Sequence, residues 1–145
     1  DAQRWAADEA ALRGAPLKVV HVWRPPPPLP SSRVAIGEDV FRDAARAVLD
    51  ESVSAGLATR TGLDVTTELV QGGPTATLVK LAGSAQLLVV GARGRGGFPE
   101  LLLGSTSAQC VAHSPCPVAV IRGYTAQRRR AREEPATAEV SGAFQ

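Results

Sequence analysis

The chain has 145 residues, of which 44% are hydrophobic and 21% charged, and its formal net charge at pH 7 is +2. This length and apolar content suit one domain with a core of its own, so no second domain is needed. The nearly balanced charge and an aromatic content of only 4% give no reason to expect a nucleic-acid partner. No apolar run approaches the length of a membrane span and the start is not a signal peptide, so we expect a cytoplasmic protein without a membrane partner.

The first half of the chain is predicted to alternate helices with strands. Apolar residues recur with helical spacing over residues 1–13 and again over residues 38–58. The run Leu17–Trp23 barely alternates, which indicates a strand buried on both faces. The proline-rich residues 24–32 are predicted to form an extended loop, because proline has no amide hydrogen and fixes φ. Residues 65–70 alternate and are rich in β-branched side chains, as expected of a strand nearer the edge of a sheet.

The second half continues this alternation. Residues 75–82 are predicted to form a short helix with Pro74 as its first residue, and residues 106–112 form another. Leu87 to Val90 is apolar on both faces and is predicted to be a central strand, and Val118–Ile121 is predicted to be the last strand. Elements that alternate with short connections predict a parallel α/β sheet with right-handed crossovers and helices on both faces. Ligands of such sheets bind beyond the carboxyl ends of the strands.

The end of the chain and its two cysteines carry less information. Residues 125–145 have mixed charge and almost no apolar periodicity, so we expect a disordered tail after a domain that covers residues 1–124. Cys110 and Cys116 lie on either side of His113, at a spacing that fits neither a C-x-x-C redox pair nor a zinc knuckle. We therefore predict buried free thiols and no metal site.

Two clusters of small residues follow the strand predicted at Leu87 to Val90. The glycines of the first cluster are Gly91, Gly94, Gly96 and Gly97. Glycine lets the backbone approach a ligand without a Cβ, so successive N–H groups can converge on an anion. The second cluster, Gly104-Ser105-Thr106-Ser107, begins the next predicted helix, where unpaired amides and the helix dipole favour phosphate. Together the clusters predict a cradle that binds one polyanion from two sides.

Two other phosphate-binding motifs do not match this stretch. A Walker A loop needs G-x-x-x-x-G-K-[ST], and from Gly91 that register reaches Gly96 followed by Gly97 instead of lysine. The dinucleotide motif G-x-G-x-x-G fails because counting from Gly94 places Pro99 at its last glycine. A flexible turn is the ordinary explanation of glycine content alone, but the position between a strand and a helix favours a ligand site.

A family resemblance rests on the same residues. The spacing Gly91-x2-Gly94-x9-Gly104-Ser105, followed by the sequence HSPCPVAVIR, resembles the universal stress protein family in its nucleotide-binding form. The resemblance runs over residues 1–122 and is strongest from residue 87 onward. It implies a flavodoxin-like α/β fold, of the adenine nucleotide alpha hydrolase-like kind, that binds ATP. A magnesium ion on the phosphates is consistent with this, but no carboxylate of the motif is committed to it.

The resemblance also implies roles for individual residues. Val22 would line the base pocket through its backbone, Val90 and Gly91 would flank the ribose and the first phosphates, and Gly94 would lie under the phosphates. Arg93 stands at a variable position of the loop and would add a supplementary charge. The residues that would close on the phosphates are Gly104, Ser105, Thr106 and Ser107. No residue is assigned a catalytic role or a metal.

The sequence departs from the family pattern at its front. Family members begin with a central strand that ends in a V-D-x-S-like segment and precedes the helix matched by residues 1–13. Here that first strand is missing, which leaves four strands of a five-stranded design, and a gap at its place would leave two rows of backbone donors and acceptors unpaired. Either the given sequence omits the segment, another chain supplies a strand, or the neighbouring strands pair with each other; we favour omission.

The functional expectations follow from the cradle and the resemblance. The resemblance implies a homodimer through the strand from Pro117 to Ile121, and an exposed apolar edge strand favours pairing on physical grounds. We expect a stress-response binding module whose occupancy by ATP changes its partners or oligomeric state, because no general base, lysine clamp or carboxylate pair accompanies the cradle. Two alternatives stay open: a slow ATPase or autophosphorylating protein with Ser105, Thr106 or Ser107 as acceptor, and an interaction domain with a vestigial site.

Overall fold

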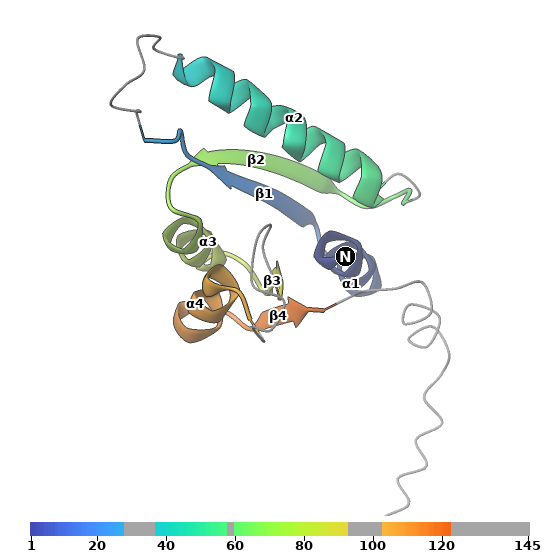
Figure 1. Cartoon of the computed structure of the whole chain (residues 1–145). Helices are drawn as coiled ribbons and strands as arrows, with labels where there is room; N and C mark the ends of the chain where they lie inside the picture. Colours follow the sequence, from blue (N-terminus) through green and yellow to red (C-terminus); the bar gives the residue numbers. More distant parts are fainter. Residues whose placement is uncertain (28–36, 58–59, 93–102, 123–145) are drawn as a thin grey trace, which may run out of the picture.

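The chain forms helices and strands in strict alternation (Figure 1). The computed structural model describes residues 1–27, 37–57, 60–92 and 103–122. Its elements in chain order are α1 (Ala2–Arg13), β1 (Leu17–Trp23), α2 (Glu38–Leu57), β2 (Val65–Gln71), α3 (Pro74–Ala82), β3 (Leu88–Gly91), α4 (Ser105–His113) and β4 (Val118–Ile121). Each element predicted from the sequence is present, and its ends agree with the prediction to within one residue. The predicted tail and part of the proline-rich loop lie outside the described residues.

The four strands form two separate parallel pairs. β1 pairs with β2 from Leu17↔Val65 to Trp23↔Gln71, and β3 pairs with β4 from Leu88↔Val118 to Gly91↔Ile121. In the described part of the chain, β1 and β3 do not pair with each other. The explanation in which the neighbouring strands close the gap is therefore wrong for these residues. Among these residues β2 has β1 as its only strand neighbour, and β3, which the sequence predicts to be central, likewise has only β4.

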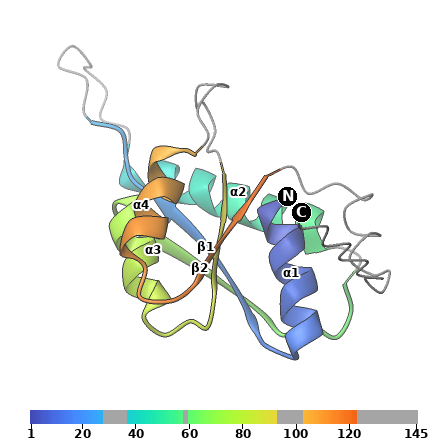
Figure 2. The same cartoon turned by 90° about the horizontal axis from the view of Figure 1, so that it is seen from below.

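Helices cover both sides of the strands. α1 contacts β1, β3 and β4, so it reaches across both strand pairs, and α2 packs beside it on β1 and β2. α3 and α4 pack against each other on the other side of the strands from α1 (Figure 2). The chain therefore has the layered parallel α/β architecture that the alternation of elements predicts.

The core is built mainly from small residues. Its buried apolar members are Ala6, Ala7, Ala10, Ala45, Leu49, Ala82, Val90, Ala92 and Cys110. The strands are less buried than their apolar sequences predict: the residues of β1 are half-buried, except for the exposed Lys18, and Val90 alone is buried in β3. A strand with a neighbour on one edge only has fewer side chains to cover it, which accounts for this difference.

One polar cluster joins α1 to the segment that follows α2. Arg60 forms an ion pair with Asp8, and its guanidinium also donates to the carbonyls of Arg4 and Gly56 at 3.1 Å each. The side chains of Arg60 and Asp8 are only 13% and 26% exposed. This contact holds α1 in place over the strands.

Candidate functional site

The carboxyl ends of β3 and β4 meet the beginning of α4. The amide of Ala92, directly after β3, donates to the carbonyl of Ile121 at the end of β4, over 2.9 Å. The carbonyl of Ala92 in turn accepts the amide of Gly104 at 2.7 Å. Gly91 of the first glycine cluster and Gly104 of the second thus lie on either side of Ala92. The other glycines of the first cluster lie outside the described residues: Gly94, Gly96 and Gly97.

A serine side chain completes this junction. The hydroxyl oxygen Oγ of Ser107 lies 3.1 Å from the carbonyl oxygen of Ala92 and 2.9 Å from that of Gly104. Ser107 and Ala92 are only 3% and 4% exposed. We call the contacts among Ala92, Gly104 and Ser107 the Ala92 junction. It fixes the first turn of α4 against the end of β3.

The first turn of α4 presents amides that no side chain of the described residues caps. Gly104 is the N-cap, with an extended backbone at φ −72° and ψ 160°, and it has no side chain that could accept their hydrogen bonds. The amide of Ala108 donates to the carbonyl of Gly104 at 2.9 Å and so closes the first turn of the helix. The amides of the three residues before Ala108 belong to the unpaired first turn of a helix, which carries a partial positive charge. Ser105 is exposed and Thr106 half-buried, so this turn is open to an external acceptor.

The remaining predicted site residues divide into three groups. Val90 is buried and Gly91 half-buried at the end of β3, next to the Ala92 junction. Val22 is half-buried near the end of β1, in the other strand pair, where it stands opposite Val70. Arg93 and Gly94 lie outside the described residues. The structure therefore brings Gly91 together with Gly104 and Ser107, and places Val22 on a strand that does not pair with β3.

Sequence reasoning did not single out Ala92 or the inward orientation of Ser107. Every residue has a carbonyl, so the sequence carries no signal for the one that accepts two hydrogen bonds. A signal for Ser107 does exist: it lies three residues before the buried Cys110, so both fall on one face of the helix. Cys110 and Cys116 are free thiols, as predicted, although Cys116 is only half-buried.

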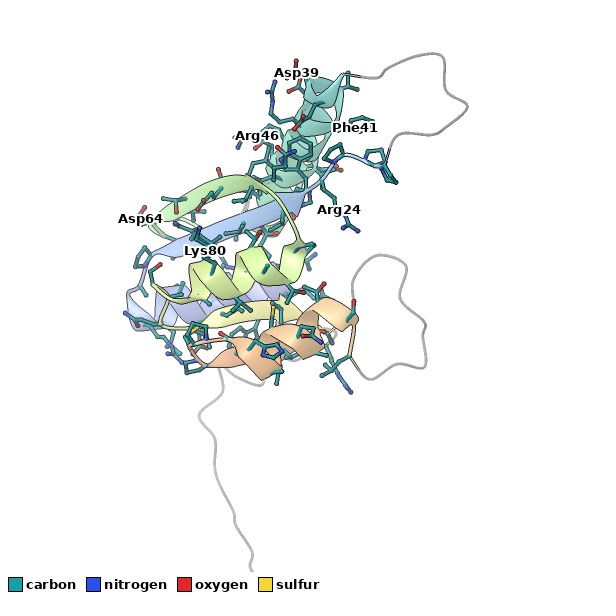
Figure 3. All side chains as sticks on the ribbon, turned by 90° about the vertical axis from the view of Figure 1, so that its left-hand side faces the viewer. Arg24, Asp39, Phe41, Arg46, Asp64 and Lys80 are labelled. Atoms are coloured by element: carbon teal, nitrogen blue, oxygen red, sulfur yellow. The ribbon has the colours of Figure 1, made fainter. Side chains whose placement is uncertain are left out.

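The two ends of the strands differ in what they offer. Figure 3 shows Arg24, which follows β1, at the carboxyl end, and Asp64, which precedes β2, at the amino end. Arg24 is exposed, and Arg122 follows β4 at the carboxyl end. This end therefore combines arginine side chains with the open helix turn of α4, a combination that favours an anion.

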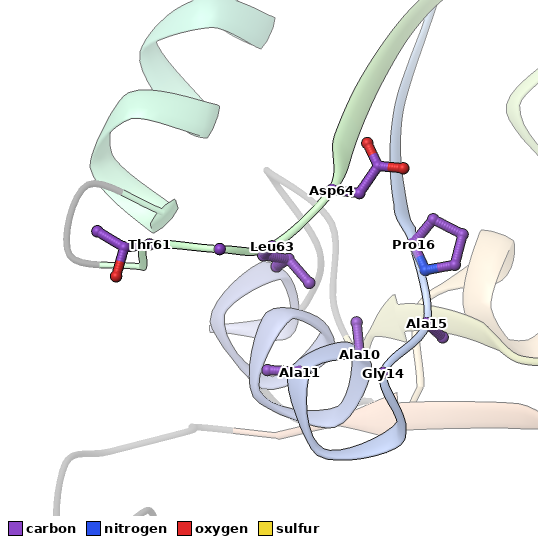
Figure 4. Close-up of a pocket in the computed structure, with 9 residues that line it drawn as sticks. Ala10, Ala11, Gly14, Ala15, Pro16, Thr61, Leu63 and Asp64 are labelled. Atoms are coloured by element: carbon purple, nitrogen blue, oxygen red, sulfur yellow. The ribbon is translucent and has the colours of Figure 1, made fainter.

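A hollow of about 440 Å³ lies at the opposite, amino end of the strands (Figure 4). It is lined by Ala10, Ala11, Gly14, Ala15, Pro16, Thr61, Gly62, Leu63 and Asp64. The end of α1 in its wall is already satisfied, because Gly14 adopts φ 59° and the amide of Ala15 donates to the carbonyl of Ala10 at 2.9 Å. The hollow is thus lined mainly by apolar side chains, with the hydroxyl of Thr61 and the carboxylate of Asp64 as its polar side-chain groups.

Neither a metal cluster nor a membrane-spanning helix occurs in the parts of the chain that the structure describes. No three His, Cys, Asp or Glu side chains of residues 1–27, 37–57, 60–92 and 103–122 come together as metal ligands would. Among the same residues, no helix combines the length and the apolar character needed to cross a bilayer.

Parallel strands between helices, with a helix beginning at their carboxyl end, define an α/β protein of the doubly wound class. Comparison with known proteins then gives the family. The family model of the universal stress protein family matches residues 1–122, and the chain belongs to that family. The resemblance drawn from the glycine spacing is confirmed.

Curated relatives support the same assignment. The chain is 39% identical over 124 residues to universal stress protein Rv2005c of Mycobacterium tuberculosis (strain ATCC 25618 / H37Rv), covering 81% of this chain and 41% of that protein. It is 33% identical over 151 residues to universal stress protein Rv2623 of the same strain, covering 97% of this chain and 49% of that protein. The chain thus spans less than half the length of these two relatives.

Solved structures confirm the flavodoxin-like α/β fold. Universal stress protein UspA from Lactobacillus plantarum superposes with a TM-score of 0.58 at 25% identity, covering 83% of this chain and 87% of that one. A universal stress protein solved in complex with cAMP superposes with a TM-score of 0.57 at 27% identity, covering 85% and 88%. That neighbour binds an adenine nucleotide.

Proposed function

We propose that this chain is a nucleotide-binding regulatory module that takes ATP at the carboxyl end of β3. The observation that carries the proposal is the uncapped first turn of α4, which the Ala92 junction fixes beside Gly91. Backbone amides would bind the phosphates there, with the helix dipole in place of a dedicated lysine. The neighbour with cAMP supports an adenine nucleotide as the class of ligand.

The remaining parts of the nucleotide have candidate partners on both strand pairs. The backbone of Val22 would meet the base, and Val90 and Gly91 would flank the ribose. Gly94 would lie under the phosphates, and Arg93, together with the exposed Arg24, would add positive charge near them. A magnesium ion would be bound mainly by the phosphate oxygens themselves, with hydroxyls as the protein ligands at hand.

Regulation would follow from binding rather than from turnover. The described cradle residues contribute amides and hydroxyls, which bind phosphate but do not act as a general base. The exposed hydroxyl of Ser105 keeps slow autophosphorylation as the second candidate function. Mass spectrometry of the chain after incubation with ATP separates the two, because only the second adds a phosphate to the protein.

We further propose that two copies pair through the strand from Pro117 to Ile121, in the cytoplasm. Among the described residues β4 has β3 as its only strand neighbour, so its other edge has unpaired amides and carbonyls. Such an edge favours strand pairing between chains. Backbone groups of Pro117, Ala119 and Ile121 face β3, so the amide of Val120 belongs to the other edge. Val120→Pro removes that amide and should shift the dimer toward the monomer in analytical ultracentrifugation. An unchanged dimer would place the interface elsewhere.

The proposed site is tested by two glycine substitutions at helix starts. Gly104→Val should reduce ATP affinity at least about tenfold in isothermal titration, because side-chain bulk would stand where phosphate meets the α4 amides. Gly73→Val is the matched control: Gly73 is the uncapped N-cap of α3, has a similar extended backbone at φ −78°, and leaves open space for a Cβ. ATP binding that is unaffected by Gly104→Val, or lost equally in both variants, would contradict the proposed site.

A further inference from the structure

The side chain of Ser107 is committed to the protein rather than turned toward solvent. Its hydroxyl has a single hydrogen to donate, and its two neighbours within hydrogen-bond distance are carbonyl oxygens, those of Ala92 at 3.1 Å and Gly104 at 2.9 Å. The residue is 3% exposed, whereas Ser105, two positions earlier, is exposed. The two serines at the start of α4 therefore stand in different environments.

The carbonyl of Ala92 is the centre of this arrangement. It accepts the amide of Gly104 at 2.7 Å and shares the hydroxyl hydrogen of Ser107, at 3.1 Å, with the carbonyl of Gly104. The amide of Ala92 itself donates to Ile121 on β4. One buried residue, Ala92, thus links the ends of two strands to the first turn of a helix.

We infer that Ser107 is a positioning residue: its hydroxyl holds the first-turn amides of α4 at the end of β3, and it does not bind phosphate through that hydroxyl. The expected consequence of this role, a change in the affinity for phosphates, rests on the proposed function. Without the hydroxyl, a buried carbonyl loses one of two partners and the helix start is held by the Gly104 amide alone. The nucleotide would then meet amides that are no longer held in one orientation.

This role predicts a selective defect. The first turn of α4 meets phosphates in the proposed complex, whereas the base lies at the end of β1, which belongs to the other strand pair. Ser107→Ala should therefore weaken ATP at least about tenfold and leave adenosine within about twofold of the unsubstituted chain. A general loss of folding would lower both affinities together.

Cys110→Ala supplies a matched control on the same buried face of α4. Cys110 is 0% exposed, so its truncation also removes buried atoms from the helix. The contacts of the Ala92 junction do not include it. We expect Cys110→Ala to keep the unsubstituted ratio of ATP affinity to adenosine affinity.

A second measurement needs no nucleotide. Hydrogen exchange of the Gly104 amide, followed by NMR in the free chain, should become at least about tenfold faster in Ser107→Ala and stay unchanged in Cys110→Ala. Unchanged exchange in Ser107→Ala would overturn the inference, as would equal losses of ATP and adenosine or a selective loss of ATP in Cys110→Ala. If the unsubstituted chain binds neither ligand, the proposed function fails, and the exchange of Gly104 alone decides the role of Ser107.

Discussion

A single buried thiol makes the stability of the fold depend on alkaline pH. Burial raises the pKa of Cys110 above its ordinary value, because the low-dielectric surroundings disfavour the thiolate. In the range between the ordinary and the raised pKa, the unfolded chain has lost the proton that the folded chain keeps. The contribution of this thiol to the free energy of unfolding is therefore complete below the ordinary pKa, and it is lost as the pH rises through the raised pKa of the folded chain.

We predict that Cys110→Ala flattens the fall in unfolding free energy at alkaline pH. Urea unfolding at neutral pH and at about pH 10, a range that brackets ordinary thiol titration, measures this slope. Cys116→Ala is the control, since Cys116 is the other free thiol of the described residues and is only half-buried. The same slope in Cys110→Ala and in the unsubstituted chain would contradict the prediction.

At the scale of single residues, the sequence predicts least about the contacts within the candidate site. Glycine spacing predicts where backbone can approach phosphate, because that depends on local side-chain bulk. The direction in which the Ser107 hydroxyl points depends on the rotation of α4 against β3, which is set by tertiary packing. The sequence therefore predicted that Gly91 and the start of α4 belong to one site, but not the junction between Ala92, Gly104 and Ser107 that the structure shows.

At the scale of elements, hydrophobic spacing was enough to predict the type and order of all the described helices and strands. Periods of 3.6 and 2 residues are strong signals, and glycine and proline mark the ends of segments. α4 begins at Ser105, one residue earlier than predicted, because Gly104 takes the N-cap position. Burial of β1 was overestimated, since an apolar run shows what a strand can bury and not whether a neighbouring strand is present to cover it.

The attachment of α1 to α2 gives an element-scale prediction. Arg60→Ala should lower the free energy of unfolding by about 2 kcal/mol, because a partly buried carboxylate and two carbonyls lose charge-assisted hydrogen bonds. Arg42→Ala is the matched control: Arg42 pairs with Asp39 at 2.8 Å, but on an exposed surface, and should change the unfolding free energy by less than about 0.5 kcal/mol. Chemical denaturation of both variants measures these changes. Equal losses of unfolding free energy in the two variants would contradict the role given to Arg60.

At the scale of the whole molecule, the distinguishing feature is a sheet in two halves. β1 and β3 each leave one edge without a strand partner among the described residues, while α1 contacts both. α1 ends near the amino end of β1 and runs antiparallel to the strands, so the first residue of α1 lies at the carboxyl end of the strands. A parallel strand between the halves would end at this place and would satisfy both edges.

We predict that joining an apolar, β-branched strand ahead of Asp1 stabilises the fold. Its backbone should pair with β1 and β3, slow hydrogen exchange of amides on both strands and raise the midpoint of thermal unfolding by several degrees. An extension of equal length in which consecutive residues are proline is the control, because successive amides of a strand face opposite edges and proline can donate to neither. If both extensions act alike, the two halves do not accept a strand.

The central claim is that the first-turn amides of α4, fixed at the end of β3, receive the phosphates of a nucleotide. Titration of the isotope-labelled chain with ATP, followed through its backbone amide resonances, tests this most directly. We expect saturable shifts that are largest from Gly104 to Ser107 and at Gly91, and small at the start of α3. Saturable shifts centred elsewhere, or no shifts at millimolar ATP, would contradict the account.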